Sequence, residues 1–265
     1  DNCLSVSAAT TYSELIELLA KVMKKQDINY DKTTKYGISI LGALNYMARR
    51  TAGRIVRNAA TIGGNTMLVL KHIPKGSGEP FPSDLFTALF SANATITYYV
   101  FSDGRFTKQE TTAEELMRDV INDATLADSI LLCSYSIPLG EPTEIVLAQK
   151  VALREVNSHS IVNITSHYNI NNDCKVTAAT IVFGGIAPYP WRATETEKAL
   201  QGKILGLEGV SIYTSILAKE VYLELKKFEE RMAEVPDEGF TIAYRVQLAV
   251  SFFYKSIIKF KQLIY

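Results

Sequence analysis

The chain has 265 residues, of which 47% are hydrophobic and 21% charged, enough for one large or two smaller globular domains with a substantial core. Its 28 basic and 28 acidic residues cancel, which argues against binding to nucleic acid. The longest apolar runs, residues 212–218 and 248–253, are too short to cross a bilayer, so we expect no transmembrane helix and no membrane partner.

The cysteines argue against a further class of site. Cys3, Cys133 and Cys174 form no Cys-x-x-Cys pair, so we expect no zinc or iron–sulfur site made by this chain alone. Free thiols are typical of a reducing compartment, which favours a cytoplasmic protein. The chain starts at Asp1, and residues 1–10 lack the features of a signal peptide. We therefore expect either that an upstream segment has been removed or that this is a piece of a longer protein.

The first half of the chain reads as helices around a few strands. Apolar residues recur at helical spacing in residues 11–26 and 36–50, and Gly53 stops the second helix. A polar segment with paired glycines follows. The remaining elements predicted in this half are a loop at 71–83, a helix at 84–91 capped by Ser83, a strand at 95–101, a hairpin turn at 103–104, a helix at 111–119 and a strand at 130–137.

The second half has long strands followed by long helices. The predicted strands are 144–153, 161–170 and 176–183, and the predicted helices are 194–201, 210–232 and 241–261. Three consecutive strands with turn residues between them predict an antiparallel meander. Strands segregated from helices in this way indicate an α+β fold, with domains at residues 1–140 and 144–265.

The glycine segment, residues 57–65, is the strongest candidate for a ligand site. Gly63 and Gly64 would let the backbone approach a ligand closely, and Thr61 and Asn65 add hydrogen-bonding groups beside them. An ordinary turn between two elements is the alternative reading of the same residues. If the segment is a loop that binds an anion, valine at both glycines should expel the ligand and leave the fold largely intact.

Four segments, taken in order, resemble the flavin portion of the molybdenum hydroxylases, the family of xanthine dehydrogenase, aldehyde oxidase and the carbon monoxide dehydrogenase flavoprotein. Residues 61–65 (TIGGN) match the core of that family's flavin loop, and residues 82–85 (PSDL) resemble its next flavin contact segment. Residues 183–188 (FGGIAP), with Arg192-Ala193 and Glu195, are similar to the signature of its C-terminal subdomain. Tyr244-Arg245 through residues 251–255 resemble its last helix.

The resemblance implies bound FAD and assigns contacts to particular residues. It implies flavin contacts for Thr61, Ile62, Gly63, Gly64 and Asn65, whose backbone amides would donate to phosphate or ribitol oxygens. It also implies that Asp84 accepts a hydrogen bond from a flavin hydroxyl, that Leu131 lies near the isoalloxazine ring, and that Lys150 lies near the N1–C2 region of this ring. The ordinary alternatives are a helix-start charge for Asp84, a core leucine for Leu131 and an exposed lysine for Lys150. Alignment through Arg154-Glu155 would place Gln149 in the lysine position instead.

The sequence departs from the family pattern at three points. Thr51 stands where some members stack an aromatic ring on the flavin. The loop after Arg154-Glu155 lacks the acidic residues that xanthine dehydrogenases use beside the nicotinamide cofactor, and its texture is closer to aldehyde oxidase, so reduction of NAD is disfavoured. The glycine-rich turn of an earlier flavin subdomain has no counterpart before residue 11.

The resemblance therefore implies an electron-transfer component of a larger oxidoreductase. Electrons would pass from iron–sulfur clusters to FAD held partly by this chain, with molybdopterin and the clusters on other chains or segments, in a dimeric assembly. No catalytic acid or base in this chain is required, because the redox chemistry belongs to the cofactor. The alternative is a structural or interaction subunit that keeps the fold without flavin, because a fold does not by itself establish function.

Overall fold

The computed structural model describes residues 2–25, 39–155, 157–206, 209–233 and 240–264. Its first half contains a four-stranded antiparallel sheet with strand order β1-β4-β2-β3. The strands are β1 (Cys3–Ser7), β2 (Thr95–Ser102), β3 (Arg105–Thr112) and β4 (Ile130–Pro138). The helices are α1 (Tyr12–Lys25), α2 (Ile40–Arg50), α3 (Arg54–Ala59), α4 (Ile62–His72), α5 (Asp84–Ser91), α6 (Ala113–Asn122) and α7 (Leu126–Ser129).

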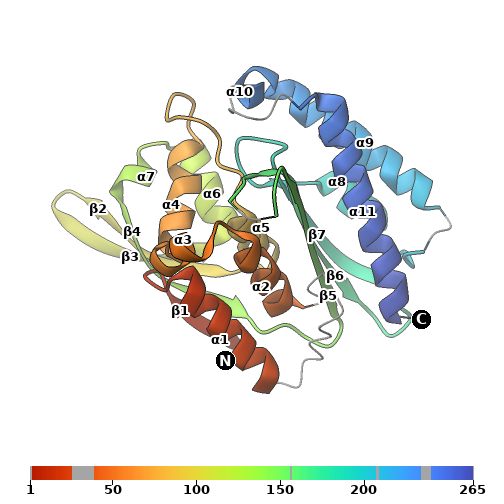
Figure 1. Cartoon of the computed structure of the whole chain (residues 1–265), viewed down its shortest axis with the longest axis horizontal. Helices are drawn as coiled ribbons and strands as arrows, with labels where there is room; N and C mark the ends of the chain where they lie inside the picture. The colour runs from red at the N-terminus through yellow and green to blue at the C-terminus, as the bar shows by residue number, and fades with distance from the viewer. Residues whose placement is uncertain (1, 26–38, 156, 207–208, 234–239, 265) are drawn as a thin grey trace.

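The second half forms another antiparallel sheet with strand order β5-β6-β7-β8. Its strands are β5 (Glu144–Ala152), β6 (Ser160–Ile170), β7 (Val176–Gly184) and the short β8 (Trp191–Arg192), and its helices are α8 (Thr194–Leu200), α9 (Val210–Lys227), α10 (Glu229–Ala233) and α11 (Ile242–Ile264). Figure 1 shows α9 and α11 together on one side of this sheet, with α2 and α5 toward the other sheet. The predicted α+β class with antiparallel strands is confirmed.

Several predicted elements differ from those observed. β1 was not anticipated from the sequence, and β8 adds a fourth strand to the predicted meander. The predicted helix 210–232 is interrupted at Phe228, so that α9 and α10 are separate. Residues 36–38 of the predicted helix 36–50 lie outside the described residues. The glycine segment contains the end of α3 and the start of α4, so its glycines lie in a first helical turn and not in a loop.

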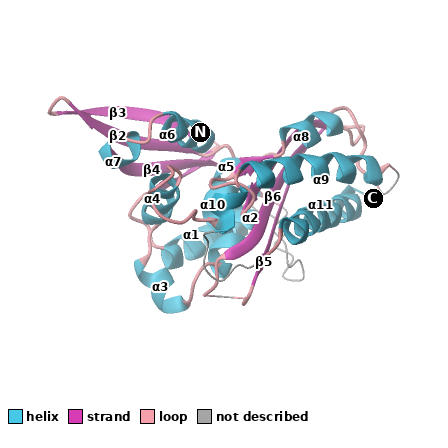
Figure 2. Ribbon diagram, turned by 90° about the horizontal axis from the view of Figure 1, so that it is seen from above, coloured by secondary structure: helices cyan, strands magenta, loops and turns pink. Residues whose placement is uncertain are grey.

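The β5–β7 sheet carries a hydrophobic core on each face. Val146 and Ala148 of β5 belong to the core of the first half, against which α2 packs, while Ile145 and Leu147 point into the second core with α9 and α11. This two-residue alternation is the normal result of burying both faces of a strand. Figure 2 shows β5 and β6 between α2 on one side and α11 on the other.

Hydroxyl caps fix where the helices near the sheets begin. Ser39, Thr61, Ser83 and Thr112 each accept a hydrogen bond from a backbone N–H of the first turn of α2, α4, α5 and α6. Such a cap replaces a partner that the helix itself cannot supply, and it contributes about 1 kcal/mol. The cap that was predicted at Ser83 is therefore present, and it sets the position of Asp84.

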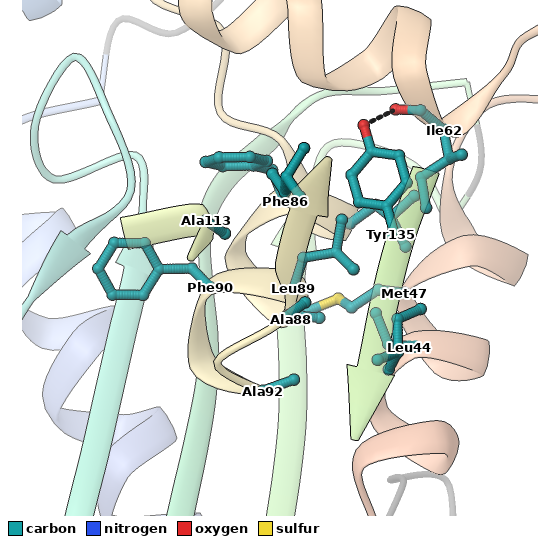
Figure 3. Packing of buried hydrophobic residues seen from close by; sticks show 14 of the residues in the cluster. Leu44, Met47, Ile62, Phe86, Ala88, Leu89, Phe90, Ala92, Ala113 and Tyr135 are labelled. Atoms are coloured by element: carbon teal, nitrogen blue, oxygen red, sulfur yellow. Dashed lines mark hydrogen bonds between the residues drawn. The ribbon is translucent and has the colours of Figure 1, made fainter. Parts of the chain in front are cut away.

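A tyrosine of the first sheet, Tyr135, holds the start of α4 by hydrogen bonds. The Tyr135 hydroxyl on β4 donates to Thr66 Oγ1 at 2.8 Å and lies 3.5 Å from the carbonyl oxygen of Ile62, the contact drawn in Figure 3. Ile62 and Tyr135 are both fully buried in the first core. The glycines that follow Ile62 are therefore held in place by the core.

Two signature segments of the second half meet in the structure. The buried Arg245 of α11 donates through Nη1 to the carbonyl oxygens of Ile161 and Gly185, both at 2.7 Å. Gly185 has φ +83°, and a Cβ there would lie 2.2 Å from the Ile161 oxygen. Only glycine is compatible with this close approach, which explains the glycine in the 183–188 segment.

The stability of the second half should depend on pH through Glu197 of α8. This carboxylate accepts the Ile181 N–H at 2.6 Å and pairs with Arg192, yet burial raises the pKa of Glu197 to about 7. At a pH between the ordinary pKa of a glutamate, 4.5, and about 7, Glu197 is deprotonated in the unfolded chain but keeps its proton in the folded chain. The free energy of unfolding should then fall as pH rises through this window, by about 3 kcal/mol.

Urea unfolding of the protein and of its Glu197→Gln variant, measured between pH 4.5 and pH 8, tests this expectation. The variant should lack the decline that is due to Glu197, because glutamine does not titrate. Parallel pH profiles for the two proteins would show that the Glu197 carboxyl is not responsible.

Candidate functional site

A cavity of about 670 Å³ opens where five segments of the chain meet. The segments are the start of α1, the end of α2 through α3, the start of α4, residues 81–84 before and at the start of α5, and the loop from β5 to β6 with the start of β6. The lining residues are Tyr12, Thr51, Ala52, Val56, Arg57, Ala60, Thr61, Gly64, Asn65, Leu68, Phe81, Pro82, Ser83, Asp84, Leu153, Arg154, Asn157, Ser158, His159 and Ile161.

The two glycines of the glycine segment have different surroundings. Gly64 lines the cavity, and a Cβ added there would meet only Thr61 Oγ1, at 3.1 Å. Gly63 faces the protein, where a Cβ would lie 2.8 Å from the carbonyl oxygen of Ala8. Gly63 thus allows α4 to pack closely on the chain after β1, and Gly64 leaves space for a ligand. Thr61 and Asn65 line the cavity beside Gly64, whereas Ile62 is in the core.

The backbone amides of this segment already have partners within the protein. Those of Ile62 and Gly63 donate to the carbonyl oxygens of Thr10 and Ala8, and that of Asn65 to the carbonyl oxygen of Thr61, at 2.9–3.0 Å. The Gly64 amide donates to the Thr61 side chain at 3.0 Å. All four amides therefore have acceptors within the protein. Their donation to phosphate or ribitol oxygens stays a prediction.

Asp84 lies at the centre of a buried polar network. Its Oδ2 accepts from Lys150 Nζ at 2.5 Å, and its Oδ1 accepts from Asn163 Nδ2 at 2.9 Å and from the Ser160 hydroxyl. The side chains of Asp84 and Lys150 are only 6% and 4% exposed. The second-half sheet therefore supplies all three partners of an acidic group that belongs to the first half.

The strand alternation separates Lys150 from Gln149. Lys150 points toward Asp84 and also donates to the Arg50 carbonyl oxygen at 3.2 Å. Gln149 is buried on the opposite face of β5 and donates to the Phe252 carbonyl oxygen of α11 at 3.1 Å. Lys150 is thus on the cavity side of the sheet but lies behind Asp84, and neither residue lines the cavity.

Leu131 and Thr51, the last two positions singled out from the sequence, differ in whether they line the cavity. Leu131 lies on β4 opposite Tyr99, is 59% exposed, and is not among the cavity-lining residues. Thr51 does line the cavity, and its hydroxyl donates to the Met47 carbonyl oxygen at 2.9 Å. The structure therefore brings together Thr51, Thr61, Gly64, Asn65 and Asp84, and leaves Leu131 outside this group.

Two further cavity residues received no individual role from the sequence, Arg57 of the glycine segment and His159 of the loop from β5 to β6. Arg57 Nη1 holds the turn between α2 and α3 through the carbonyl oxygens of Arg49, Thr51 and Ala52, at 2.9–3.1 Å. His159 packs edge-on against Phe81 with ring centroids 5.3 Å apart. Phe81 and His159 are far apart in the sequence, so no local motif marks their contact.

Comparison with known families identifies the family of this chain. The sequence model for the FAD binding domain in molybdopterin dehydrogenase matches residues 1–140, and that for the CO dehydrogenase flavoprotein C-terminal domain matches residues 148–260. The chain belongs to the flavoprotein family of the molybdenum hydroxylases. The cavity in this FAD-binding domain lies at the junction of the two matched regions.

Individual relatives are similar over nearly the whole chain. The chain is 27% identical to a xanthine dehydrogenase from Blastobotrys adeninivorans, over 95% of this chain and 16% of the relative, and 26% identical to aldehyde oxidase 1 from Bos taurus, over 100% and 18%. It superposes on CO dehydrogenase from Oligotropha carboxidovorans with a TM-score of 0.66 at 17% identity, covering 99% of this chain and 76% of that chain. This FAD-binding domain therefore spans less than a fifth of the length of these two curated relatives. Within its described residues, no helix is long and apolar enough to span a membrane.

The cavity has the size and lining of a small-molecule site. Its volume is within the usual range for small-molecule sites of roughly 300–1,000 Å³. Apolar side chains such as Leu68 and Leu153 line it together with the polar groups of Asn65 and Asp84. Gly64 provides a surface that a side chain would fill. The residues present thus fit a ligand that combines an aromatic ring, hydroxyl groups and charge.

Proposed function

We propose that this domain forms one wall of the FAD site in a molybdenum-containing hydroxylase and passes electrons from iron–sulfur clusters on other segments to an acceptor. The observation that supports this most directly is the convergence of Gly64, Asn65 and Asp84 on one cavity. When bound, FAD supplies the redox chemistry, accepting and releasing electrons at its ring system. The protein residues bind and orient the cofactor and tune its electrostatic environment.

Each part of the cofactor would meet a suitable group of the chain. Asp84 would accept a hydrogen bond from a flavin hydroxyl, and Thr61 and Asn65 would bind beside it. Positive charge for the diphosphate would come from Arg57 and Arg154, which both line the cavity. Lys150 would act through Asp84. A contact of Leu131 with the isoalloxazine ring stays a prediction.

The composition of the loop from β5 to β6, which lines the cavity, supports a proposal about the electron acceptor. Asn157, Ser158 and His159 stand on this loop without an acidic residue among them. We propose oxygen or a protein as the acceptor in place of NAD. The site would be completed by another polypeptide segment in a dimeric cytoplasmic enzyme, with iron–sulfur and molybdopterin domains or subunits as partners.

The absorption spectrum of the native assembly purified with this chain tests the proposal. We expect flavin bands at about one flavin per chain, and release of FAD on denaturation. An assembly that contains its iron–sulfur and molybdenum centres but no flavin would contradict the proposal and would support a structural subunit instead.

A further inference from the structure

Three residues on neighbouring strands hold the Asp84 carboxylate. Two of them donate hydrogen bonds to it, and the third contacts one of these donors. Asn163 of β6 lies opposite Lys150 of β5 and opposite Gly184 of β7, so the three residues form a row across the sheet. Asp84 stands at the start of α5, above this row, and receives hydrogen bonds from Lys150 and Asn163. The row therefore links the 183–188 segment to the cavity.

The orientation of the Asn163 amide is set by Gly184. The Gly184 N–H donates to Asn163 Oδ1 at 3.1 Å, and since an N–H needs an acceptor, the oxygen of the amide must face Gly184. The NH₂ group then points at Asp84 Oδ1, 2.9 Å away. Asn163 is fully buried, so water cannot replace either contact.

Gly184 also provides the space that the Asn163 amide occupies. A Cβ at Gly184 would lie 2.7 Å from both Oδ1 and Nδ2 of Asn163. Any larger residue at this position would displace the amide from Asp84. The second glycine of the pair, Gly185, has a separate role in the contact with Arg245 that was described above.

Within the described residues, the network leaves one acceptor position on Asp84. A carboxylate has about four lone-pair positions, and Asn163, Ser160 and Lys150 use three of them. Asp84 lines the cavity, so the remaining position is available to a hydroxyl donor in the ligand. The direction of this lone pair depends on the donors that hold the carboxylate.

We propose that Asn163 is a positioning residue of the flavin site, held by Gly184 so that it aims the Asp84 carboxylate at a flavin hydroxyl. This inference rests on the proposed function and deepens it. It assigns to the first glycine of the 183–188 segment a role in cofactor binding, although Gly184 itself does not line the cavity.

The test measures FAD affinity in the native assembly, stripped of flavin and titrated with FAD by fluorescence quenching. Gly184→Ala and Asn163→Ala should each weaken FAD binding about tenfold, as expected for the loss of a hydrogen bond to a charged group. The double variant should be no weaker than either single variant, because both changes remove the same contact. The matched control is Thr165→Val on the same strand, which removes a buried hydroxyl that has no hydrogen-bond partner among the described residues, and this variant should bind FAD normally.

A second measurement separates positioning from packing. In an Asp84→Asn background, Gly184→Ala should have little further effect on FAD affinity, whereas a packing effect of the added methyl group would persist. If Gly184→Ala does not fold, Asn163→Ala carries the same comparison, because it adds no atoms. Tenfold losses that add in the double variant, or unchanged affinity in both single variants, would overturn the positioning role. An unaltered assembly that binds no FAD would instead overturn the proposed function, and the positioning role with it.

Discussion

Gly64→Val is expected to remove FAD from the assembly while changing the free energy of unfolding of the chain little. The valine side chain would project into the cavity, where only Thr61 Oγ1 lies within 4 Å of the added Cβ. The position is helical and has an ordinary backbone conformation, so no strain in φ is introduced. Flavin content per chain, read from the absorption spectrum, and urea unfolding together measure the effect.

Gly63→Val, in contrast to Gly64→Val, is expected to destabilise the fold. Its Cβ would lie 2.8 Å from the backbone oxygen of Ala8, which cannot move without shifting the chain after β1. Overpacking of this kind costs about 1–3 kcal/mol or more. We therefore expect Gly63→Val to destabilise the fold, which corrects the sequence-based expectation that both glycines would affect only the cofactor. Equal flavin content in Gly64→Val and the unaltered chain would show that the cavity does not hold the flavin.

Lys150→Met is expected to produce the largest loss of stability. Asp84 would keep a buried negative charge without its cation, and breaking one partner of a buried ion pair costs about 3–5 kcal/mol. The double variant with Asp84→Asn should recover much of this loss, because it removes the uncompensated charge. Urea unfolding of the two variants measures both effects.

An exposed ion pair supplies the control for this experiment. Lys71 pairs with Asp128 at 3.2 Å, but the two side chains are 53% and 78% exposed. Solvent screens such a pair, so Lys71→Met should leave the unfolding curve unchanged. If Lys150→Met also left the unfolding curve unchanged, we would conclude that Lys150 and Asp84 do not form an ion pair in solution.

The sequence predicted the helices and strands well where their signals are local. The helix at Asp84–Ser91 follows from its Ser83 cap and apolar residues, and the turn at Asp103-Gly104 follows from residues that tolerate positive φ. The four family segments also indicated the correct family.

The functions of individual residues depended on contacts that are distant in sequence. The acceptors of the Ile62 and Gly63 amides, Thr10 and Ala8, lie more than fifty residues earlier, so the glycine segment alone does not reveal them. Lys150 and Gln149 could not be separated by alignment, since one residue of shift reverses the face of a strand. The pairing of β5 with β6 settles their directions, with Lys150 toward Asp84.

The arrangement of the two cores limits how relatives of this protein can exchange parts. A crossover between residues 140 and 144 would take Val146 and Ala148 from one parent and the helix that covers them from another. It would also separate Asp84 from Lys150, Ser160 and Asn163. The two halves are therefore expected to diverge together, and a chimera joined at this point should need matched substitutions on α2, α5 and the facing side of β5 and β6 before it folds cooperatively.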